Sequence, residues 1–288
     1  MSPSPRIGAV IPARSTSERL PGKQLADLGG APVIVRMIER LASSRFITAT
    51  SDVVLCTTED TADEELAAVA AGCGASVFRG DTDDLIRRLG DAVEAHAFDI
   101  VIEADGDDPF IEMGYTDRAI ELLLEDPTVD VVLPPTLPLG LAAKVVRGSA
   151  FETVRRSYRT TANDTGFMYF FTRSGLCSVT TLDPLDERHV RPDIRLTLDY
   201  AEDLDLMRTV FAELDGAAHV FGADELVGLF ERRPELAALN SHLSERYWER
   251  TRDLVNLEFE VDGQLQVIRE ADDNDWTRAI ERADQPES

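Results

Sequence analysis

The sequence predicts an α/β fold in which a mostly parallel sheet carries helices on both faces. Over the first two hundred residues, short apolar runs typical of buried strands alternate with amphipathic stretches typical of helices. Hydrophobic residues make up 43% of the 288-residue chain, enough for one or two domains with a proper core. Ligands of such sheets bind beyond the carboxyl ends of the strands, so we expect function in the loops that follow the apolar runs.

Each expected strand is a short aliphatic or aromatic run, and each expected helix has apolar residues three to four positions apart. In the first half, we expect strands over residues 7–11, 52–56, 76–78, 99–103 and 129–133, and helices over residues 32–41, 63–71, 83–96 and 116–124.

The second half is less regular between residues 134 and 190. It carries the short run Lys144-Val145-Val146, to which we assign no element. There we expect a helix over 151–158 and an aromatic strand over 167–171, followed by a strand over 194–198 and a helix over 202–214. We assign residues 1–233 to the main domain and 234–288 to a C-terminal extension. The extension has a helix through Tyr247 and Leu254, a hairpin of 257–261 and 264–268 around Asp262-Gly263, and an acidic tail expected to fray.

The charge balance is strongly acidic. Acidic residues number 54 against 29 basic ones, a formal net charge of −25, and the only lysines are Lys23 and Lys144. This balance argues against binding nucleic acid or an anionic membrane, and favours a surface adapted to a high-salt cytoplasm over a functional acidic patch. No apolar run approaches the length of a membrane span and no secretory signal is visible. The three cysteines are scattered, so we expect free thiols and a cytoplasmic location.

The most specific segment is residues 11–23, with the sequence IPARSTSERLPGK. A strand ends and a long loop follows, in which hydroxyl residues and a glycine accompany Arg14, Arg19 and Lys23. Backbone N–H groups and these cations suit a triphosphate. The spacing is neither that of a Walker loop, because Gln24 follows Gly-Lys, nor that of GxGxxG. The alternative is a solvated loop with scattered charges.

Two acidic segments also follow expected strands. Residues 103–111, EADGDDPFI, place carboxylates in a turn made by glycine and proline, where they suit Mg²⁺. Residues 195–204, RLTLDYAEDL, end an expected strand at Asp199, and Glu202 and Asp203 suit the first turn of the next helix. In so acidic a chain, each could also be an ordinary acidic turn.

The three segments, in this order, resemble those of the cytidylyltransferases that activate sugar acids. These are the CMP-KDO and CMP-acylneuraminate synthetases and, most of all, the spore-coat-polysaccharide type. The resemblance covers roughly residues 5–215. It implies a Rossmann-like sheet of the nucleotide-diphospho-sugar transferase (GT-A-like) type and Mg²⁺-dependent transfer of CMP from CTP to an acceptor, with release of pyrophosphate. It also implies a homodimer, with the aromatic segment 167–171 and the 134–190 insertion as its surface.

The resemblance also assigns roles to individual residues. Residues 78–89 resemble a stretch of the spore-coat subgroup that puts Arg88 near the nucleotide, on a helix that Asp81 or Thr82 would cap; the alternative is a solvated arginine. Asp107 and Asp199 match the metal-binding aspartates. The implied catalytic residues are Arg14, Lys23, Arg88, Asp107 and Asp199, and the nucleotide-binding residues are Pro12, Ala13, Arg14, Ser17, Arg19, Lys23, Thr57, Thr58, Arg88 and Asp105.

The sequence departs from the family where the acceptor should bind. Spore-coat-type members tend to have acidic residues after a Pro-x-Gly turn, whereas residues 138–144 read PLGLAAK. A lysine in place of carboxylates favours an anionic acceptor such as a carboxylate, phosphate or phosphonate. The expected acceptor-binding residues are Lys144, Arg147, His189 and Arg191; the alternative makes Lys144 a surface residue.

Three other functions remain open from the sequence. One is a transferase of the same fold that uses another nucleotide and a sugar 1-phosphate. Another is a nucleotide-binding or scaffolding protein without catalysis. The third is a glycosyltransferase, for which Asp105-Gly106-Asp107 formally supplies the metal motif, although that class has no reason to carry the RLPGK segment.

Overall fold

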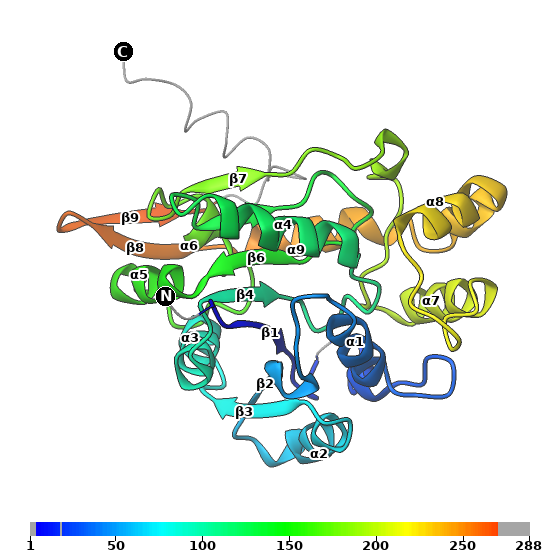
Figure 1. Cartoon of the computed structure of the whole chain (residues 1–288), viewed down its shortest axis with the longest axis horizontal. Coiled ribbons are helices and arrows are strands. Elements are labelled where there is room, and N and C mark those ends of the chain that lie inside the picture. The colour runs from blue at the N-terminus through cyan, green and yellow to red at the C-terminus, as the bar shows by residue number, and fades with distance from the viewer. Residues whose placement is uncertain (1–3, 18, 270–288) are drawn as a thin grey trace.

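A seven-stranded sheet forms the centre of the computed structural model, which describes residues 4–17 and 19–269 (Figure 1). The strand order is β3-β2-β1-β4-β6-β5-β7. Strand β6 runs antiparallel to β4 and β5, and the other neighbouring strands are parallel, which confirms the predicted mostly parallel sheet. The strands are β1 (Ile7–Pro12), β2 (Val53–Thr58), β3 (Ser76–Gly80), β4 (Ile100–Glu103), β5 (Val131–Leu133), β6 (Lys144–Arg147) and β7 (Val179–Thr181).

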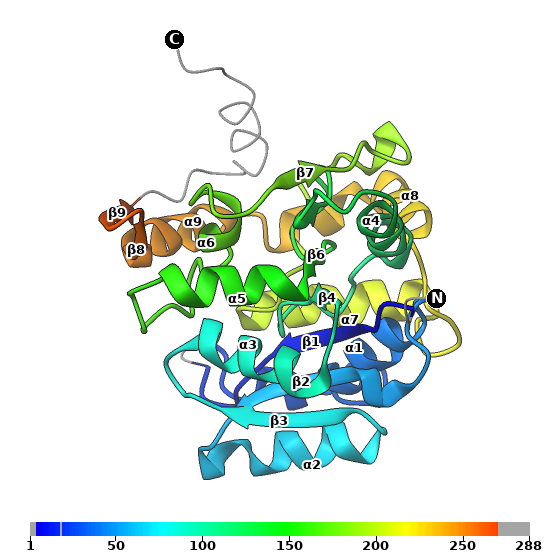
Figure 2. The same cartoon turned by 60° about the vertical axis from the view of Figure 1, so that its left-hand side comes forward.

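Helices cover both faces of this sheet and create two cores (Figures 1 and 2). Neighbouring residues of β1 separate accordingly, with Ala9 and Ile11 in one core and Val10 in the other, because side chains alternate along a strand. Strands covered on both faces read as continuous apolar runs, as β2 and β4 do. One face holds α1 (Val33–Ala42), α2 (Glu64–Gly72), α4 (Met113–Glu125), α7 (Ala201–Glu213) and α8 (Ala223–Arg232); the other holds α3 (Leu85–His96), α5 (Gly148–Ser157) and α6 (Tyr169–Thr172).

The C-terminal extension has the predicted form. Helix α9 (Leu243–Leu254) leads into a hairpin of β8 (Leu257–Val261) and β9 (Gln264–Ile268) that turns at Asp262-Gly263. Leu257 and Phe259 pack into the core of α3, α5 and α6, so the hairpin lies against the main domain. The domain boundary at residue 234 stays a prediction, and the acidic tail, 270–288, lies outside the described residues.

Most predicted elements of the first two hundred residues are confirmed within a few positions. Helix α8 and strand β7 were not predicted, and the run 144–146, which was assigned no element, forms strand β6. Helix α3 is capped by Asp84, whose side chain accepts the N–H of Arg87 at 3.0 Å, and not by Asp81 or Thr82. Short 3₁₀ turns lie at Lys23–Leu25, Thr50–Asp52, Thr61–Asp63, Glu187–His189 and Pro234–Leu239.

The aromatic segment 167–171 is not the strand that we expected. The segment leads into the short helix α6. Residues 167–171 are all buried in the core, whereas a strand with one face toward solvent would alternate buried and exposed residues. The ring centroids of Phe171 and Phe151 lie 5.0 Å apart, and those of Phe170 and Phe259 lie 6.3 Å apart. Since the segment is buried within one chain, the prediction that it forms an exposed dimer surface is also wrong.

Residues 194–198 also differ from the prediction of a strand. Their chain is extended, but it forms one isolated bridge, between Arg195 and Leu139, outside the sheet. Its backbone pairs with loops instead: Leu196 N donates to Leu139 O at 2.6 Å and Leu198 N donates to Asp107 O at 2.8 Å. The segment is therefore fixed against the loop after β4, which places Asp199 beside that loop.

Among the described residues, each helix is too short or too polar to span a bilayer. The thiols of Cys56, Cys73 and Cys177 are free, as their spacing predicts.

We expect Phe170→Ala to lower the free energy of unfolding by about 3–5 kcal/mol, because it opens a cavity among packed rings. Chemical denaturation at constant salt measures the change. Leu265→Ala is the control, since that side chain is 60% exposed on β9, and it should change stability by less than about 0.5 kcal/mol. Equal losses in the two variants would contradict the packing described for α6.

Candidate active site

A cavity of about 360 Å³ lies at the carboxyl ends of β1 and β4, where the strand pattern predicts a ligand site. The loop after β1 and the loop after β4 form its floor. The proline-rich stretch 134–140, residues 164–169 and helix α9 complete its walls. All three motifs identified in the sequence reach this cavity or the residues directly behind it.

Asp63 holds the loop after β1 in shape. Its buried carboxylate accepts the N–H of Ser15 at 2.6 Å and that of Thr58 at 3.2 Å. Burial would raise the pKa of Asp63, but the hydrogen bonds from Ser15 and Thr58 outweigh burial and lower it. Sequence reasoning missed this residue, because an aspartate before a helix is also an ordinary cap.

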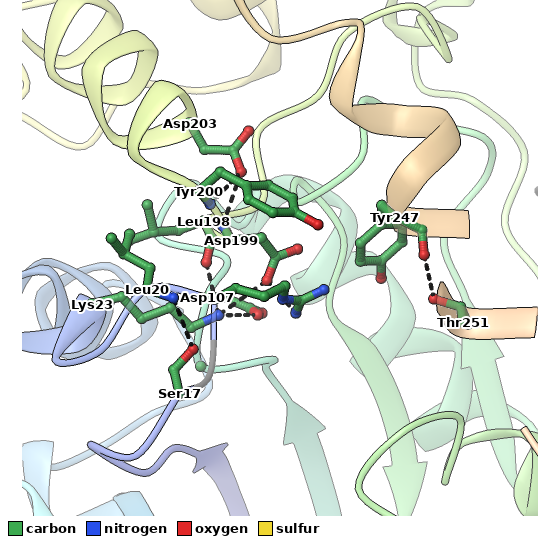
Figure 3. A network of polar contacts seen from close by, with 12 residues as sticks. Ser17, Leu20, Lys23, Asp107, Leu198, Asp199, Tyr200, Asp203, Tyr247 and Thr251 are labelled. Atoms are coloured by element: carbon green, nitrogen blue, oxygen red, sulfur yellow. Dashed lines mark hydrogen bonds and ion pairs between the residues drawn. The ribbon is translucent and has the colours of Figure 1, made fainter. Parts of the chain in front are cut away.

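Lys23 lies at the end of that loop and reaches the other two motifs (Figure 3). Gly22, with φ of 70°, lets the chain turn just before it. The buried Nζ lies 2.7 Å from Asp107 Oδ2, 2.7 Å from the Leu198 carbonyl oxygen and 3.2 Å from Asp199 Oδ1. Burial opposes the charge of Lys23, but the two carboxylates raise its pKa. One ammonium group thus joins three segments that are distant in sequence.

Asp199 is fully buried and surrounded by cations. It pairs with Arg19 and Lys23 through one oxygen and with Arg195 through the other, at 3.0 Å. Burial and the charge of Asp107 raise the pKa of Asp199. For Asp107 burial acts in the same direction, but Lys23 outweighs it and the pKa is lowered. The pKa values of these two adjacent carboxyl groups are therefore shifted in opposite directions.

Asp203 and Asn240 support Asp199 from behind. The Asp203 carboxylate accepts the N–H groups of Asp199 and Tyr200, both at 2.9 Å, and pairs with Arg195. Asn240 Nδ2 donates to Asp203 Oδ1 at 2.8 Å. We predicted Asp203 only as a first-turn residue, and Asn240 gave no sequence signal.

The predicted metal ligands fit Mg²⁺. Asp107 and Asp199 converge on one positive group, the Lys23 ammonium, which shows that both carboxylates can face a single cation. Mg²⁺ prefers one or two carboxylates with phosphate oxygens and water. Gly106 brings the two loops together, because a Cβ there would lie 2.2 Å from the Pro12 carbonyl oxygen.

Arg14 and Arg88 line the cavity, as do Pro12, Ala13 and Ser17. Arg88 is buried and donates to the Asp81 carbonyl oxygen at 2.7 Å, so the alternative of a solvated helix arginine is wrong. Its Nε has no hydrogen-bond partner among the described residues. Arg14 pairs across the cavity with Asp164 at 2.9 Å.

Lys144 lies in the cavity wall and is buried, so the alternative of a surface lysine is also wrong. It pairs with Asp105, and its Nζ lies 3.2 Å from Glu103 Oε2. Burial opposes the charge, but the two carboxylates raise the pKa of Lys144. Burial and the charge of Asp105 raise the pKa of Glu103 to about 8. Two carboxylates, one at the end of β4 and one in the loop after it, therefore surround the Lys144 ammonium group.

Thr57 and Thr58 do not line the cavity, although we expected them near the nucleotide. Both are buried beneath the loop after β1. Thr58 donates its hydroxyl to Asp63 at 2.5 Å and therefore supports the loop indirectly.

The structure places Arg147, His189 and Arg191 outside the cavity, against the prediction for the acceptor site. Arg147 stands at the far end of β6 from Lys144 and donates to carbonyl oxygens at the end of α4. The His189 ring is buried between the Tyr115 hydroxyl, 3.0 Å away, and Asp224, 3.2 Å away. Arg191 pairs with Asp193.

We expect Asp63→Ala to lower the free energy of unfolding by about 1–3 kcal/mol, because the part-buried Ser15 N–H and the buried Thr58 N–H lose a charged acceptor. The pKa of Asp63 is lowered in the folded state. Its contribution is therefore complete above the unfolded pKa of about 3.9 and disappears as the pH falls through the folded value. Denaturation of wild type and variant from pH 3 to 7 should show the difference shrinking in acid.

Asp60→Ala is the matched control, because within the part of the chain that the structure describes that exposed carboxylate accepts only a local N–H, from Ala62. A pH-independent difference for Asp63→Ala, or an equal loss in the control, would contradict the role of Asp63.

Comparisons with known proteins agree with this geometry. Residues 9–215 match the cytidylyltransferase family model. The spore coat polysaccharide biosynthesis protein SpsF of Bacillus subtilis is 28% identical over 231 residues, which cover 79% of this chain and 95% of that protein. A 3-deoxy-manno-octulosonate cytidylyltransferase of Francisella philomiragia is 38% identical over 126 residues, or 42% of this chain and 47% of that one.

A solved cytidylyltransferase from Leptospira borgpetersenii has the same fold, with a TM-score of 0.72 at 24% identity over 81% of this chain and 97% of the other. The family match spans most of the sheet and all three motifs. The chain therefore belongs to the cytidylyltransferase family of CTP-using nucleotidyltransferases.

Proposed function

We propose that this protein transfers CMP from CTP to a small anionic acceptor, a sugar acid or a phosphate or phosphonate, and releases pyrophosphate. The observation that carries the proposal is the convergence of Lys23, Asp107 and Asp199 at the edge of the cavity. These parts are a basic loop after one strand, a carboxylate from the loop after a second strand, and another from the segment that leads into α7. They are the parts that a metal-assisted phosphoryl transfer requires.

In the proposed reaction, an acceptor oxygen attacks the α-phosphorus of CTP in line with the bond to pyrophosphate. The new P–O bond forms as the old one breaks, and an attacking hydroxyl passes its proton to water or to the Asp199 carboxylate. Arg14 and Lys23 would neutralise the leaving pyrophosphate, and Arg88 would position the nucleotide. Asp107 and Asp199 would hold Mg²⁺, which supplies charge stabilisation at the phosphate oxygens.

The charge of the cavity supports anionic substrates. In a chain with 54 acidic and 29 basic residues, basic side chains are concentrated in this wall, where four acidic side chains also lie. The basic residues are Arg14, Arg19, Lys23, Arg88, Lys144 and Arg250. Lys144 remains our candidate for the acceptor, and Asp105 beside it would orient it. A homodimer, implied by the family resemblance, also remains a prediction.

We expect pyrophosphate release with CTP and not with UTP, GTP or ATP, and its loss when Mg²⁺ is chelated. The assay offers each nucleotide with sugar acids, sugar 1-phosphates and small phosphonates, at high and low salt. Release with UTP or GTP and a sugar 1-phosphate would favour the other transferase activity. Thermal protection by CTP without turnover on any acceptor would favour a nucleotide-binding protein without catalysis.

We expect Asp107→Asn to reduce turnover about 10²–10³-fold, because it removes one charge from the site where phosphate charge must be stabilised. Steady-state kinetics with saturating CTP measures the loss, and thermal unfolding checks that the variant is folded. Asp193→Asn is the control, since that carboxylate pairs with Arg191 away from the cavity. Turnover of Asp107→Asn within a fewfold of wild type would contradict the proposal.

A further inference from the structure

Two tyrosine rings contact Arg19, an arginine of the loop that we assign to the triphosphate. Its guanidinium carbon lies 5.8 Å from the ring centroid of Tyr200 and 5.9 Å from that of Tyr247. Both distances are within the range of a cation–π contact. Tyr200 stands at the start of helix α7, whereas Tyr247 comes from helix α9 of the C-terminal extension (Figure 3). Two distant segments therefore each contribute a ring to one cation.

The same two rings contact a second arginine. The guanidinium carbon of Arg195 lies 4.8 Å from the ring centroid of Tyr247 and 6.0 Å from that of Tyr200. Arg195 is buried and pairs with Asp199 and Asp203, but its Nη1 has no hydrogen-bond partner among the described residues. The electron-rich face of Tyr247 therefore attracts this guanidinium where an acceptor oxygen is lacking.

Contacts at both ends of α9 fix Tyr247 in this place. Leu243 at the start of the helix and Val255 just after its end are both buried. Just before the helix, Asn240 Nδ2 donates to the carbonyl oxygen of Arg195 at 3.0 Å. The extension thus holds Arg195 twice, at its backbone through Asn240 and at its guanidinium through Tyr247.

Arg19 needs a support other than its carboxylate partner if it is to bind phosphate. It pairs with Asp199 through the oxygen that Lys23 also contacts. Asp199 is a proposed metal ligand, so both it and Arg19 change partners when the nucleotide and Mg²⁺ bind. The ion pair with Asp199 is lost in that exchange. The contact with a neutral ring can persist, because the ring does not repel phosphate and need not be displaced by it.

The contact lies in the wall of the cavity. Arg19 and Tyr247 both line the cavity, whereas Tyr200 is buried behind them. A ring in the wall is also placed to contact the base of the nucleotide directly. These two roles predict different responses to a ligand that has phosphates but no base.

We propose that Tyr247 is a positioning residue for the nucleotide: its ring, with that of Tyr200, holds the Arg19 guanidinium where the triphosphate of CTP binds. The proposal rests on the proposed function. Tyr247 acts through Arg19 and not on the reacting atoms. The family match ends at residue 215 and does not reach α9, so this role gives the C-terminal extension a part in the site.

Binding of tripolyphosphate tests this role without a base, an acceptor or turnover. We expect Tyr247→Ala and Tyr247→Leu to weaken the binding of tripolyphosphate and of CTP by the same factor, about 3- to 30-fold, because each removes a cation–π contact. Tyr247→Phe should bind both ligands within about twofold of wild type, because a phenyl ring keeps the π face. Calorimetry with Mg²⁺ at constant salt measures the dissociation constants, and thermal unfolding checks that each variant is folded.

A double-mutant cycle shows whether the ring acts through Arg19. In an Arg19→Ala background, Tyr247→Ala should change the affinity for CTP by less than about twofold, because the cation that the ring holds is already gone. Ser244→Ala is the matched control. This half-buried residue lies on the same helix but outside the cavity wall, so its substitution should leave the affinity of the wild type unchanged.

Weaker binding of CTP with unchanged binding of tripolyphosphate would overturn the proposal and place Tyr247 against the base. Additive losses in the double variant, a loss in Tyr247→Phe equal to that in Tyr247→Ala, or wild-type binding by Tyr247→Leu would overturn it as well. The proposed function fails separately, if no nucleotide supports pyrophosphate release with any acceptor while the binding results are as expected.

Discussion

The site depends on one buried ammonium group, that of Lys23, held between Asp107 and Asp199. It ties the loop after β1 to the loop after β4 and to the segment that leads into α7. Three cations and three carboxylates form the whole cluster, and removing any member leaves an uncompensated charge, which is costly in a buried setting. The cluster consists of Arg19, Lys23 and Arg195 with Asp107, Asp199 and Asp203.

Much of this arrangement could be predicted from the sequence, for physical reasons. Buried strands leave a clear apolar signature, and the carboxyl ends of parallel strands meet at one edge of a sheet. Residues just after such strands, among them Arg14 and Asp107, therefore had to lie close together. That Asp199 joins them was implied only by the family resemblance. Its own segment is not a sheet strand, and hydrogen bonds with Leu139, with the loop after β4 and with Lys23 hold it there.

The wrong predictions share a cause. They used the type of each residue but not the direction in which its side chain points. Arg147 follows Lys144 by three residues, but about 10 Å of strand separates them, so one faces the cavity and the other faces the opposite edge. The rings of residues 167–171 were assigned by β-propensity, although contacts from α5 and the hairpin decide their conformation. Asp63 could not be distinguished among 54 acidic residues. Its importance lies in the hydrogen bonds that it accepts from the N–H groups of Ser15 and Thr58, which the sequence does not show.

Two cations of the cavity that we assign to the nucleotide are already paired with carboxylates, Arg14 with Asp164 and Arg19 with Asp199. A triphosphate that binds to these arginines would replace the carboxylates of Asp164 and Asp199 as their partners. Because the arginines are already neutralised, the net charge of the whole chain governs the approach of the nucleotide. With a net charge of −25, that field repels the nucleotide at low ionic strength. Near 1 M salt the screening length falls to about 3 Å and the repulsion vanishes. High salt should therefore raise the rate at which the nucleotide associates with this protein. At a positively charged binding site, salt lowers the association rate of an anion.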